Sequence, residues 1–266
     1  MDIATLVGLL VCLGCVVLGI SNGPDGWASF GNFYDLPSIF ITVGGCLGEI
    51  LASNSIASFL AGLKGFVLSL KGVKFDEGEI IKNIIDLSNI ARKEGLLALE
   101  EAANNMEDEF IKKGILLIVD GTDPELVRGI METELSCVED RHGEVITFWD
   151  YFGAMGPAWG MIGTLIGLIN MLKHMEDVST VGPNMSTALL TTLYGSLIAN
   201  WICTPISNKL KQNNQIEVKV KQVMIEGLLS IQAGENPRVI EEKLKSFLSP
   251  KKREELSQKN EAGGGE

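Results

Sequence analysis

This chain of 266 residues lacks most of the residue patterns that support catalysis. It has only two histidines, and it contains no phosphate-binding loop, no nucleophile elbow and no HExxH motif. Cys12 and Cys15 have zinc-like spacing, but no second cysteine pair or histidine lies near them in the sequence. We therefore expect no enzyme, no bound metal and no resident cofactor. The net charge of −12 offers no basic surface, so no nucleic-acid partner is expected.

Charge is also missing from three long apolar stretches, which cover residues 3–20, 151–172 and 185–206. About 20 apolar residues cross a bilayer as a helix. A fourth stretch, residues 36–51, is shorter and carries Glu49 near its end. The sequence therefore predicts four membrane spans. The first is expected to be a retained helix and not a signal peptide, because no basic segment precedes it.

The basic residues predict how these spans are oriented. Of 22 lysines and arginines, ten lie in residues 52–150 and eleven in residues 207–266. The two short loops between spans hold only one, Lys173. Because basic residues stay on the cytoplasmic side, both termini and the region 52–150 are expected in the cytoplasm, and the fold is predicted to be an all-α membrane protein. The expected parts are residues 1–51 (spans one and two), 52–150 (a helical cytoplasmic domain), 151–206 (spans three and four) and 207–266 (a cytoplasmic tail).

The cytoplasmic parts show helical periodicity with few strand-like alternations. Residues 55–70 predict an amphipathic helix that leaves the membrane. Thr122 to Glu125 match a capping box, which predicts a helix from Pro124 to about Phe148. After about Leu248 the sequence is polar, and a disordered end is expected.

Span three carries a regular row of glycines, spaced three and four residues apart: Gly153, Gly156, Gly160, Gly163 and Gly167. This spacing keeps one face of a helix free of side chains, and small residues let helices approach closely in a membrane. Ordinary packing within the chain explains such a row, and so does a surface that moves against another helix. Pro157 lies inside the row and removes one backbone hydrogen bond, which indicates a hinge or a freed carbonyl.

Polar residues in spans three and four predict a hydrophilic lining. Thr164 lies beside the glycine row, and Thr192, Ser196 and Asn200 follow one another at four-residue spacing. Buried threonines often bond to their own helix, but a stripe of this kind also suits a small cation or a file of water. Spans one, three and four contain no Asp, Glu, His, Lys or Arg. Because ion pathways normally need an intramembrane carboxylate, an ion-conducting assembly would have to obtain it from another chain.

Several motifs resemble one known family. They are GPAWGMIGTLIGL at 156–168, ALLTTLYGSLIAN at 188–200, CTP at 203–205, DLPSIFITVGG at 35–45 and ARKEGLLALEE at 91–101. Over nearly its whole length the chain resembles the A subunit of the flagellar stator, the MotA/PomA family. The resemblance implies four spans, a large cytoplasmic region between spans two and three, and a cytoplasmic tail.

The resemblance also implies a mechanism. About five copies would ring two copies of a B subunit, whose single span supplies an aspartate and whose periplasmic domain binds peptidoglycan. Ion binding at that aspartate would turn the ring in the cell membrane lipid. Pro157 and Pro205 match the two prolines of the family. Arg92 and Glu100 match its charged contacts with the rotor switch protein, although the residues alone fit a solvated helix face. The glycine row would then let ring and partner slide closely past each other.

Some alternatives stay open at this point. The cargo could be a proton, which we favour, or a sodium ion, because Thr164 and Thr192 resemble sodium-type members. The function could also be that of a TonB- or Tol-type energiser subunit, which shares the last two spans. A self-contained channel is disfavoured by the missing carboxylate. Asp35, Glu176 and Asp177 could gather cations at the outer face, and Glu49 is expected at the membrane interface.

Overall fold

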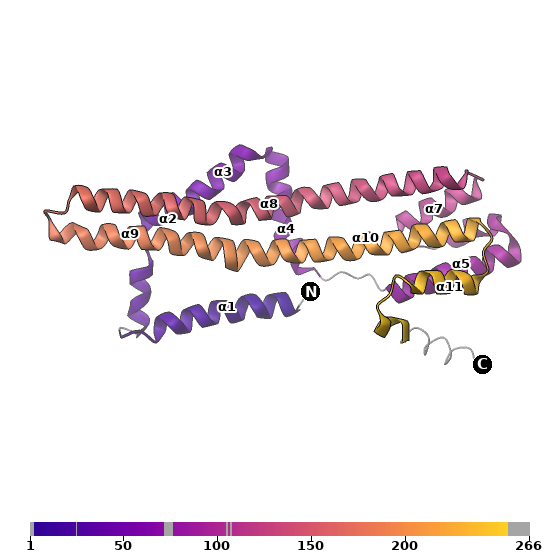
Figure 1. Cartoon of the computed structure of the whole chain (residues 1–266), viewed down its shortest axis with the longest axis horizontal. Helices are drawn as coiled ribbons and strands as arrows, with labels where there is room; N and C mark the ends of the chain where they lie inside the picture. Colours follow the sequence, from indigo (N-terminus) through magenta and orange to yellow (C-terminus); the bar gives the residue numbers. More distant parts are fainter. Residues whose placement is uncertain (1–2, 25, 72–76, 105, 107, 255–266) are drawn as a thin grey trace. The chain divides into compact units, whose positions relative to one another are not determined.

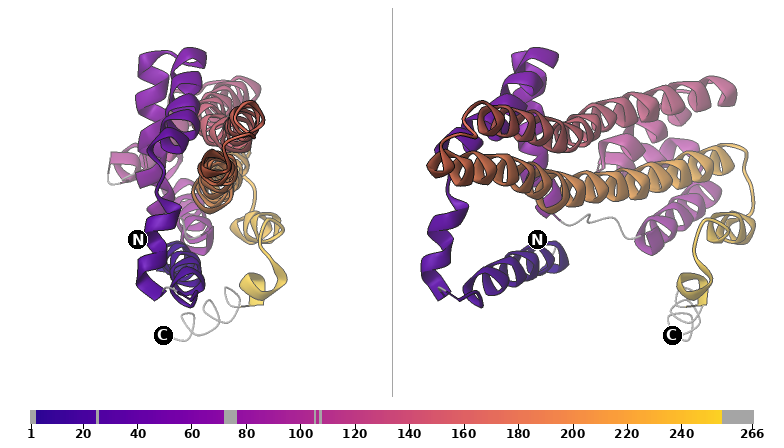
Figure 2. Two further views of the ribbon diagram at one scale, coloured as in Figure 1. Left: turned by 90° about the vertical axis from the view of Figure 1, so that its left-hand side faces the viewer. Right: turned by 60° about the vertical axis from the view of Figure 1, so that its left-hand side comes forward.

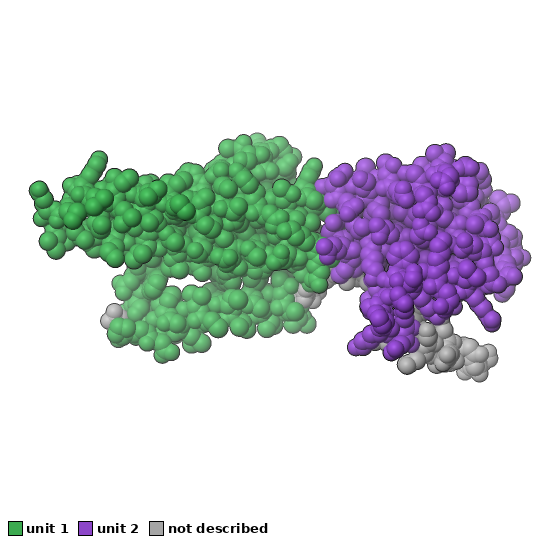
Figure 3. All heavy atoms as spheres, in the orientation of Figure 1, with its two compact units in different colours: residues 1–72, 141–212 green, residues 73–140, 213–266 purple. Residues whose placement is uncertain are grey.

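The computed structural model describes residues 3–24, 26–71, 77–104, 106 and 108–254. These fall into two compact units, coloured separately in Figure 3. Unit 1 comprises residues 1–72 and 141–212, and unit 2 comprises residues 73–140 and 213–266. Each unit is described by itself below.

Unit 1 is built from helices and is shown in the ribbon of Figure 1. Its elements are α1 (Ile3–Ser21), η1 (Gly26–Phe33), α2 (Leu36–Ile39), η2 (Phe40–Gly44), α3 (Gly45–Ser53), α4 (Ile56–Leu70), the later part of α8 (Pro124–Lys173), α9 (Val178–Leu197), η4 (Ile198–Cys203) and the start of α10 (Thr204–Gln232). Four helical stretches are long and apolar enough to cross a membrane: Ile3–Ser21, Leu36–Ser53, Pro124–Lys173 and Val178–Gln232. The four predicted spans and the all-α fold are thus confirmed.

The long helices run past the limits that apolar composition predicts. Helix α8 is one continuous helix of 50 residues, whereas the sequence predicts an end near Phe148 before a separate span. Span four likewise continues through η4 into α10 without a turn. Polarity changes along these helices, but no cap or turn residue stops them. The predicted limits at residues 150 and 206 therefore lie inside helices, and the compact units divide at residues 140 and 212 instead.

The start of α8 differs from the predicted capping box by one residue. The Asp123 side chain accepts a hydrogen bond from the Glu125 backbone N–H at 3.0 Å. The Thr122 carbonyl instead accepts one from Gln232 at 2.6 Å. Aspartate is as good an N-cap as threonine, so the two adjacent candidates could not be separated by sequence.

Helix α4 packs through its smallest residues. Gly62 and Gly65 are buried, and a Cβ atom at either position would collide with the side chains of Phe148 or Val145 on α8. The Trp149 indole donates to the Gly62 carbonyl at 2.9 Å. Phe59 packs against Phe148, but most of the large apolar side chains of α4 are exposed, namely those of Ile56, Leu60, Leu63, Phe66 and Val67. The predicted helix is therefore present, and most of its apolar stripe lies on the surface of the chain.

Unit 2 is a helical bundle with its own core. Its elements are α5 (Glu77–Glu94), η3 (Leu96–Ala98), α6 (Leu99–Asn104), α7 (Glu109–Val119), the early part of α8, the later part of α10 and α11 (Pro237–Lys245). Fully buried side chains fill its centre, among them Ile81, Ile84, Leu99, Ile115, Met131, Met224, Leu228 and Ile240. The prediction of helices throughout this part of the chain is confirmed for the described residues of the unit.

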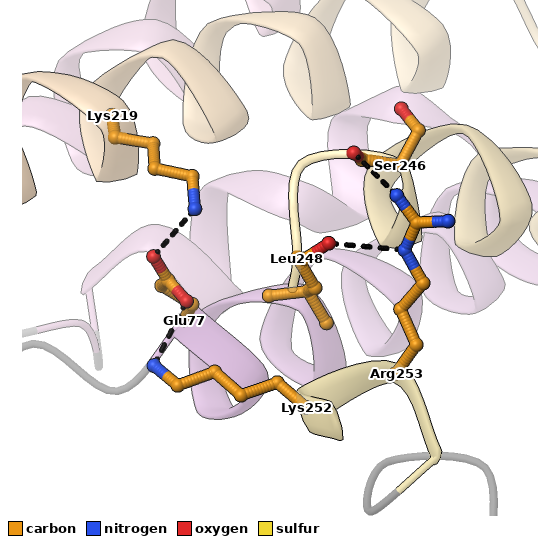
Figure 4. A network of polar contacts seen from close by, with 6 residues as sticks. All are labelled: Glu77, Lys219, Ser246, Leu248, Lys252 and Arg253. Carbon is orange, nitrogen blue, oxygen red and sulfur yellow. Dashed lines mark hydrogen bonds and ion pairs between the residues drawn. The ribbon is translucent and has the colours of Figure 1, made fainter. Parts of the chain in front are cut away.

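The C-terminal segment of unit 2 is held to the rest of the unit by ion pairs and hydrogen bonds (Figure 4). Glu77, the first residue of α5, is buried and accepts from Lys219 at 3.0 Å and from Lys252 at 2.9 Å. Arg253 donates to the carbonyl oxygens of Leu248 and Ser246 at 3.0 and 2.9 Å. Residues 250–254 are helical, so the prediction of a disordered end after Leu248 is wrong for them. Residues 255–266 lie outside the described residues.

Replacing Glu77 with glutamine is expected to remove an acid-sensitive part of the stability of this unit. Burial alone would raise the pKa of the Glu77 carboxyl, but hydrogen bonds from Lys252 and Lys219 outweigh burial and hold the pKa below its ordinary value. A carboxyl whose pKa is lower in the folded than in the unfolded state stabilises the fold at pH values above its unfolded-state pKa. This stabilisation is lost as the pH falls through the folded-state pKa. At pH 7 Glu77→Gln should cost about 1.5–3 kcal/mol.

The measurement is thermal unfolding of the full-length protein in detergent between neutral and acidic pH. The matched control is Glu79→Gln, because Glu79 is exposed on the same helix. Identical pH profiles for wild type and Glu77→Gln would contradict the role of this carboxyl.

Candidate functional site

Helices α8 and α9 lie side by side along their membrane segments, as both views of Figure 2 also show. Their contact is nearly backbone on backbone. A Cβ atom at Gly160 would lie 2.9 Å from the Thr191 carbonyl oxygen, and one at Gly167 would lie 2.8 Å from the Asn184 carbonyl oxygen. At Gly156 it would lie 2.6 Å from the carbonyl oxygen of Gly195, which is itself a glycine on α9. Only missing side chains permit this approach.

The whole glycine row faces its own chain. Gly163 lies against the side chain of Thr191, and Gly153 lies against Cys203, where an added Cβ would be 3.2 Å from the Cys203 Cβ. These contacts support packing within one chain, and sliding of the five glycines against a central partner stays a prediction. They hold spans three and four of one subunit together, which was the alternative reading of the sequence.

The close approach brings two predicted hydroxyl groups into contact. The Thr164 Oγ1 of α8 lies 2.6 Å from the Thr192 Oγ1 of α9. Thr164 also lies 2.9 Å from the Ala188 carbonyl oxygen and 3.0 Å from the Gly160 carbonyl oxygen. Four oxygen atoms thus converge at one level of the helix pair. Neutral oxygens of this kind are good ligands for a hard cation and good partners for water. The contribution of Ala188 was missed, because a backbone carbonyl leaves no trace in a sequence.

The polar stripe continues along α9 beyond this oxygen cluster. Ser196 is half-buried one turn further, and its carbonyl accepts from the Asn200 side chain at 3.1 Å. Here the helix widens into the π-helix η4. The Thr204 hydroxyl donates to the Ala199 carbonyl at 2.8 Å, immediately before Pro205. The Ala199 carbonyl also accepts from the Thr204 backbone N–H, so Thr204 binds the widened turn through both its backbone and its side chain.

Pro157 is accommodated inside α8 without ending it. It follows Gly156, the residue whose carbonyl contacts Gly195 of α9. The proline ring removes the backbone donor that the Gly153 carbonyl would otherwise use. Pro157 is exposed, so it lies on a face of α8 that this chain leaves open. The structure thus places the proline beside the contact between Gly156 and Gly195 of the two spans.

Polar contacts tie helix α9 to η1 and to the start of span two. Asp35 caps α2 by accepting from the backbone of Ser38 at 3.0 Å, and it also accepts from the Thr187 hydroxyl at 3.2 Å. The Tyr194 hydroxyl donates to the Phe33 carbonyl at 2.6 Å. Asp177 caps α9 in the same way, accepting from Ser179. Both acidic residues therefore have capping roles, and a cation-gathering role remains a prediction.

Glu49 is the one carboxylate within span two, and it forms a cluster that sequence reading missed. Its two oxygens accept from the Trp159 indole at 2.6 Å and from the Tyr151 hydroxyl at 3.0 Å. Both partners lie on α8, and Tyr151 also approaches the Ser53 hydroxyl at 3.4 Å. Two donors compensate an acidic group in an apolar region, so Glu49 links α3 to α8. The sequence identified the carboxylate but not its two donors, because the donors lie about 100 residues further along the chain.

We expect Glu49→Leu to destabilise the contact of α3 with α8. The substitution leaves the Trp159 and Tyr151 donors without their acceptor, at about 1–3 kcal/mol for each buried unpaired group. Glu49→Gln keeps one acceptor oxygen and should cost less. Heat unfolding of the detergent-solubilised protein, followed by tryptophan fluorescence, ranks the variants. A Glu49→Leu variant as stable as wild type would contradict this link.

Comparison with known proteins agrees with this geometry. The sequence model of the MotA/TolQ/ExbB proton channel family matches residues 102–223. Motility protein A of Treponema phagedenis is 41% identical, covering 96% of this chain and 97% of the relative. The chain belongs to the motility protein A family. Chemotaxis protein PomA of Vibrio alginolyticus is 39% identical over 95% of this chain and 98% of its own length.

Solved structures of the family share the fold. The flagellar MotAB stator complex from Bacillus subtilis matches with a TM-score of 0.85 and 32% identity, covering 94% of this chain and 98% of that one. The MotAB structure from C. jejuni matches with a TM-score of 0.84 and 30% identity, covering 94% of this chain and 97% of that one. The family resemblance of the sequence is therefore confirmed. The energiser alternative is weaker, because TolQ and ExbB share only the wider family whose match covers part of the chain.

The family's charged positions lie at an exposed turn of unit 2. Arg92 is in the last turn of α5, and Glu100 is in the first turn of α6. Both are exposed, and neither forms an ion pair with another described residue. Gly95, with a φ of +88°, makes the turn between them. The structure thus leaves both charges available on either side of one turn, as a contact surface would require.

Proposed function

We propose that this chain is the A-type subunit of a flagellar stator, which couples inward ion flow to rotation of the flagellar rotor. The oxygen cluster of Thr164, Thr192, Ala188 and Gly160 carries this proposal. It offers ligands without charge at the level where spans three and four meet. An ion at this level needs a negative partner.

The carboxylates of this chain do not supply that charge. Glu49 is held by Trp159 and Tyr151, and Asp35 caps a helix at the outer end. A B-type partner with an aspartate in its single span supplies it instead. The MotAB complexes among the structural neighbours support such a partner. Several copies of the chain, about five, form a ring around two copies of the partner.

The remaining roles follow from this arrangement. The four spans lie in the lipid of the inner membrane, with both termini and unit 2 in the cytoplasm. Ser196 and Pro157 continue the lining of the ion path, and Pro157 and Pro205 act as hinges that pass movement toward unit 2. Arg92 and Glu100 contact opposite charges on the rotor switch protein. The chain needs no cofactor and catalyses no covalent step, and its cargo is a proton or, as the second candidate, a sodium ion.

A motility assay tests the proposal and the cargo together. Cells that lack this gene should build flagella but not swim, and the intact gene should restore swimming. For a proton-driven stator, the restored swimming speed should not change with sodium concentration at fixed pH. A strong dependence on sodium would replace the proton with sodium. Normal swimming without the gene, and without a second stator gene in the cell, would contradict the proposal.

A further inference from the structure

The turn between Arg92 and Glu100 displays an apolar side chain toward solvent. Leu97 is 75% exposed, and its neighbour Leu96 is 36% exposed. Both belong to the short helix η3. A largely exposed leucine next to charged residues gives up the gain from burial that it would have in a core. Single exposed leucines are common, so exposure alone assigns no role.

The turn holds Leu97 in a fixed position. The Gly95 backbone N–H donates to the Ala91 carbonyl at 3.0 Å, and the Ala98 N–H donates to the Gly95 carbonyl at 3.3 Å. Two residues beyond Leu97, Leu99 is fully buried in the core of unit 2. The exposed leucine is thus presented by a turn with regular hydrogen bonds and anchored on both sides.

Opposite charges flank this side chain along the sequence. Arg92 and Lys93, followed by a single acidic residue, Glu94, precede it in the last turn of α5, and Glu100 and Glu101 follow it in the first turn of α6. These side chains are exposed. An apolar centre with a charged rim is the usual composition of a protein interface. The order of the charges defines the partner surface, which must carry acidic residues on one side of an apolar hollow and basic residues on the other.

We propose that Leu97 is the apolar centre of the surface that contacts the rotor. This inference rests on the proposed function and adds a residue to it. The occupant is a protein surface with an apolar hollow between an acidic and a basic patch. Exposed ion pairs contribute little each and weaken in salt, so they orient the encounter. Leu97 supplies a contact that salt does not screen.

The test compares Leu97→Ser with Leu126→Ser. Leu126 is the matched control, because it is 57% exposed on another helix of unit 2. Purified full stator complex of each variant is titrated with the purified rotor switch protein, at low and at high salt, and swimming is scored in cells. Leu97→Ser should raise the dissociation constant about tenfold at both salt concentrations, because burying one leucine side chain in an interface contributes a free energy of that size. Leu97→Met should restore binding, and Leu126→Ser should bind as wild type does.

The charge variant Arg92→Glu separates this inference from the proposed function. If Arg92→Glu weakens binding at low salt but Leu97→Ser does not, the role of Leu97 is overturned and the rotor contact stands. If wild-type complex does not bind the switch protein at all, the proposed rotor contact itself fails. If Leu97→Ser changes the size of the purified complex, the leucine contacts a second copy of the chain, and the inference is overturned.

Discussion

Gly160→Leu is expected to abolish swimming. Even the first added carbon would lie 2.9 Å from the Thr191 carbonyl oxygen, and backbone cannot move aside as a flexible side chain can. The two helices would have to separate, which also pulls Thr164 away from Thr192. Overpacking of this kind costs about 1–3 kcal/mol or more. We therefore expect lowered heat stability as well as lost torque, with the chain still inserted in the membrane.

The control for this substitution is Gly8→Leu. Gly8 lies in the membrane helix α1, and nothing in the chain lies within 4 Å of a Cβ atom added there. Swimming speed and the unfolding temperature of the purified complex are measured for both variants. Unchanged swimming of Gly160→Leu would refute the role of close helix contact. A loss of swimming with unchanged stability would instead support the view that the glycine row acts between chains.

Thr164→Val is expected to reduce ion-driven torque about tenfold or more, since each hydrogen bond to a charged group contributes about 1.5–3 kcal/mol. Valine has nearly the same shape as threonine but offers no oxygen. The substitution removes the centre of the oxygen cluster, the atom that lies 2.6 Å from the Thr192 Oγ1. Thr192→Val should have a similar effect, because it removes the other hydroxyl. Thr164→Ser should retain function because it keeps the oxygen.

A second membrane threonine provides the control. Thr42 is buried in span two and donates to the Thr191 carbonyl at 3.4 Å, outside the oxygen cluster. Torque of single motors is measured for Thr164→Val, Thr164→Ser and Thr42→Val at equal membrane abundance. If Thr164→Val and Thr42→Val lose torque equally, the oxygen cluster has no special role in ion coupling.

Composition was sufficient to predict the spans, but not where the helices end. Apolar length identifies a membrane segment because the bilayer core has a fixed thickness. A helix, however, ends only where its backbone finds a cap or a turn. Residues 141–150 mix polar and apolar side chains, and Gly143 among them keeps a helical backbone without a positive φ, so α8 passes through the predicted limit. The same reasoning explains α10, which follows η4 without a break even though Pro205 lies near its start.

The sequence predicted which residues of the candidate site share a helix face, but not which parts of the chain those faces meet. Spacing placed Thr164 and the glycine row on α8, and the hydroxyl stripe on α9, because one helix repeats every 3.6 residues. It could not say which helix the glycine row would face. It also could not predict the Glu49 cluster or the Ala188 oxygen, because those depend on residues distant in sequence or on backbone atoms. The family resemblance, not periodicity, selected Arg92 and Glu100.

The most direct test of the stator account is to identify what this chain binds in its native membrane. The chain is purified in mild detergent, and the proteins that accompany it in fixed proportion are identified by mass spectrometry. The account predicts a partner with a single span that contains an aspartate, and with a domain that binds peptidoglycan. A partner with a long periplasmic arm directed at the outer membrane would contradict it, and the rotor roles of Arg92, Leu97 and Glu100 would be lost with it.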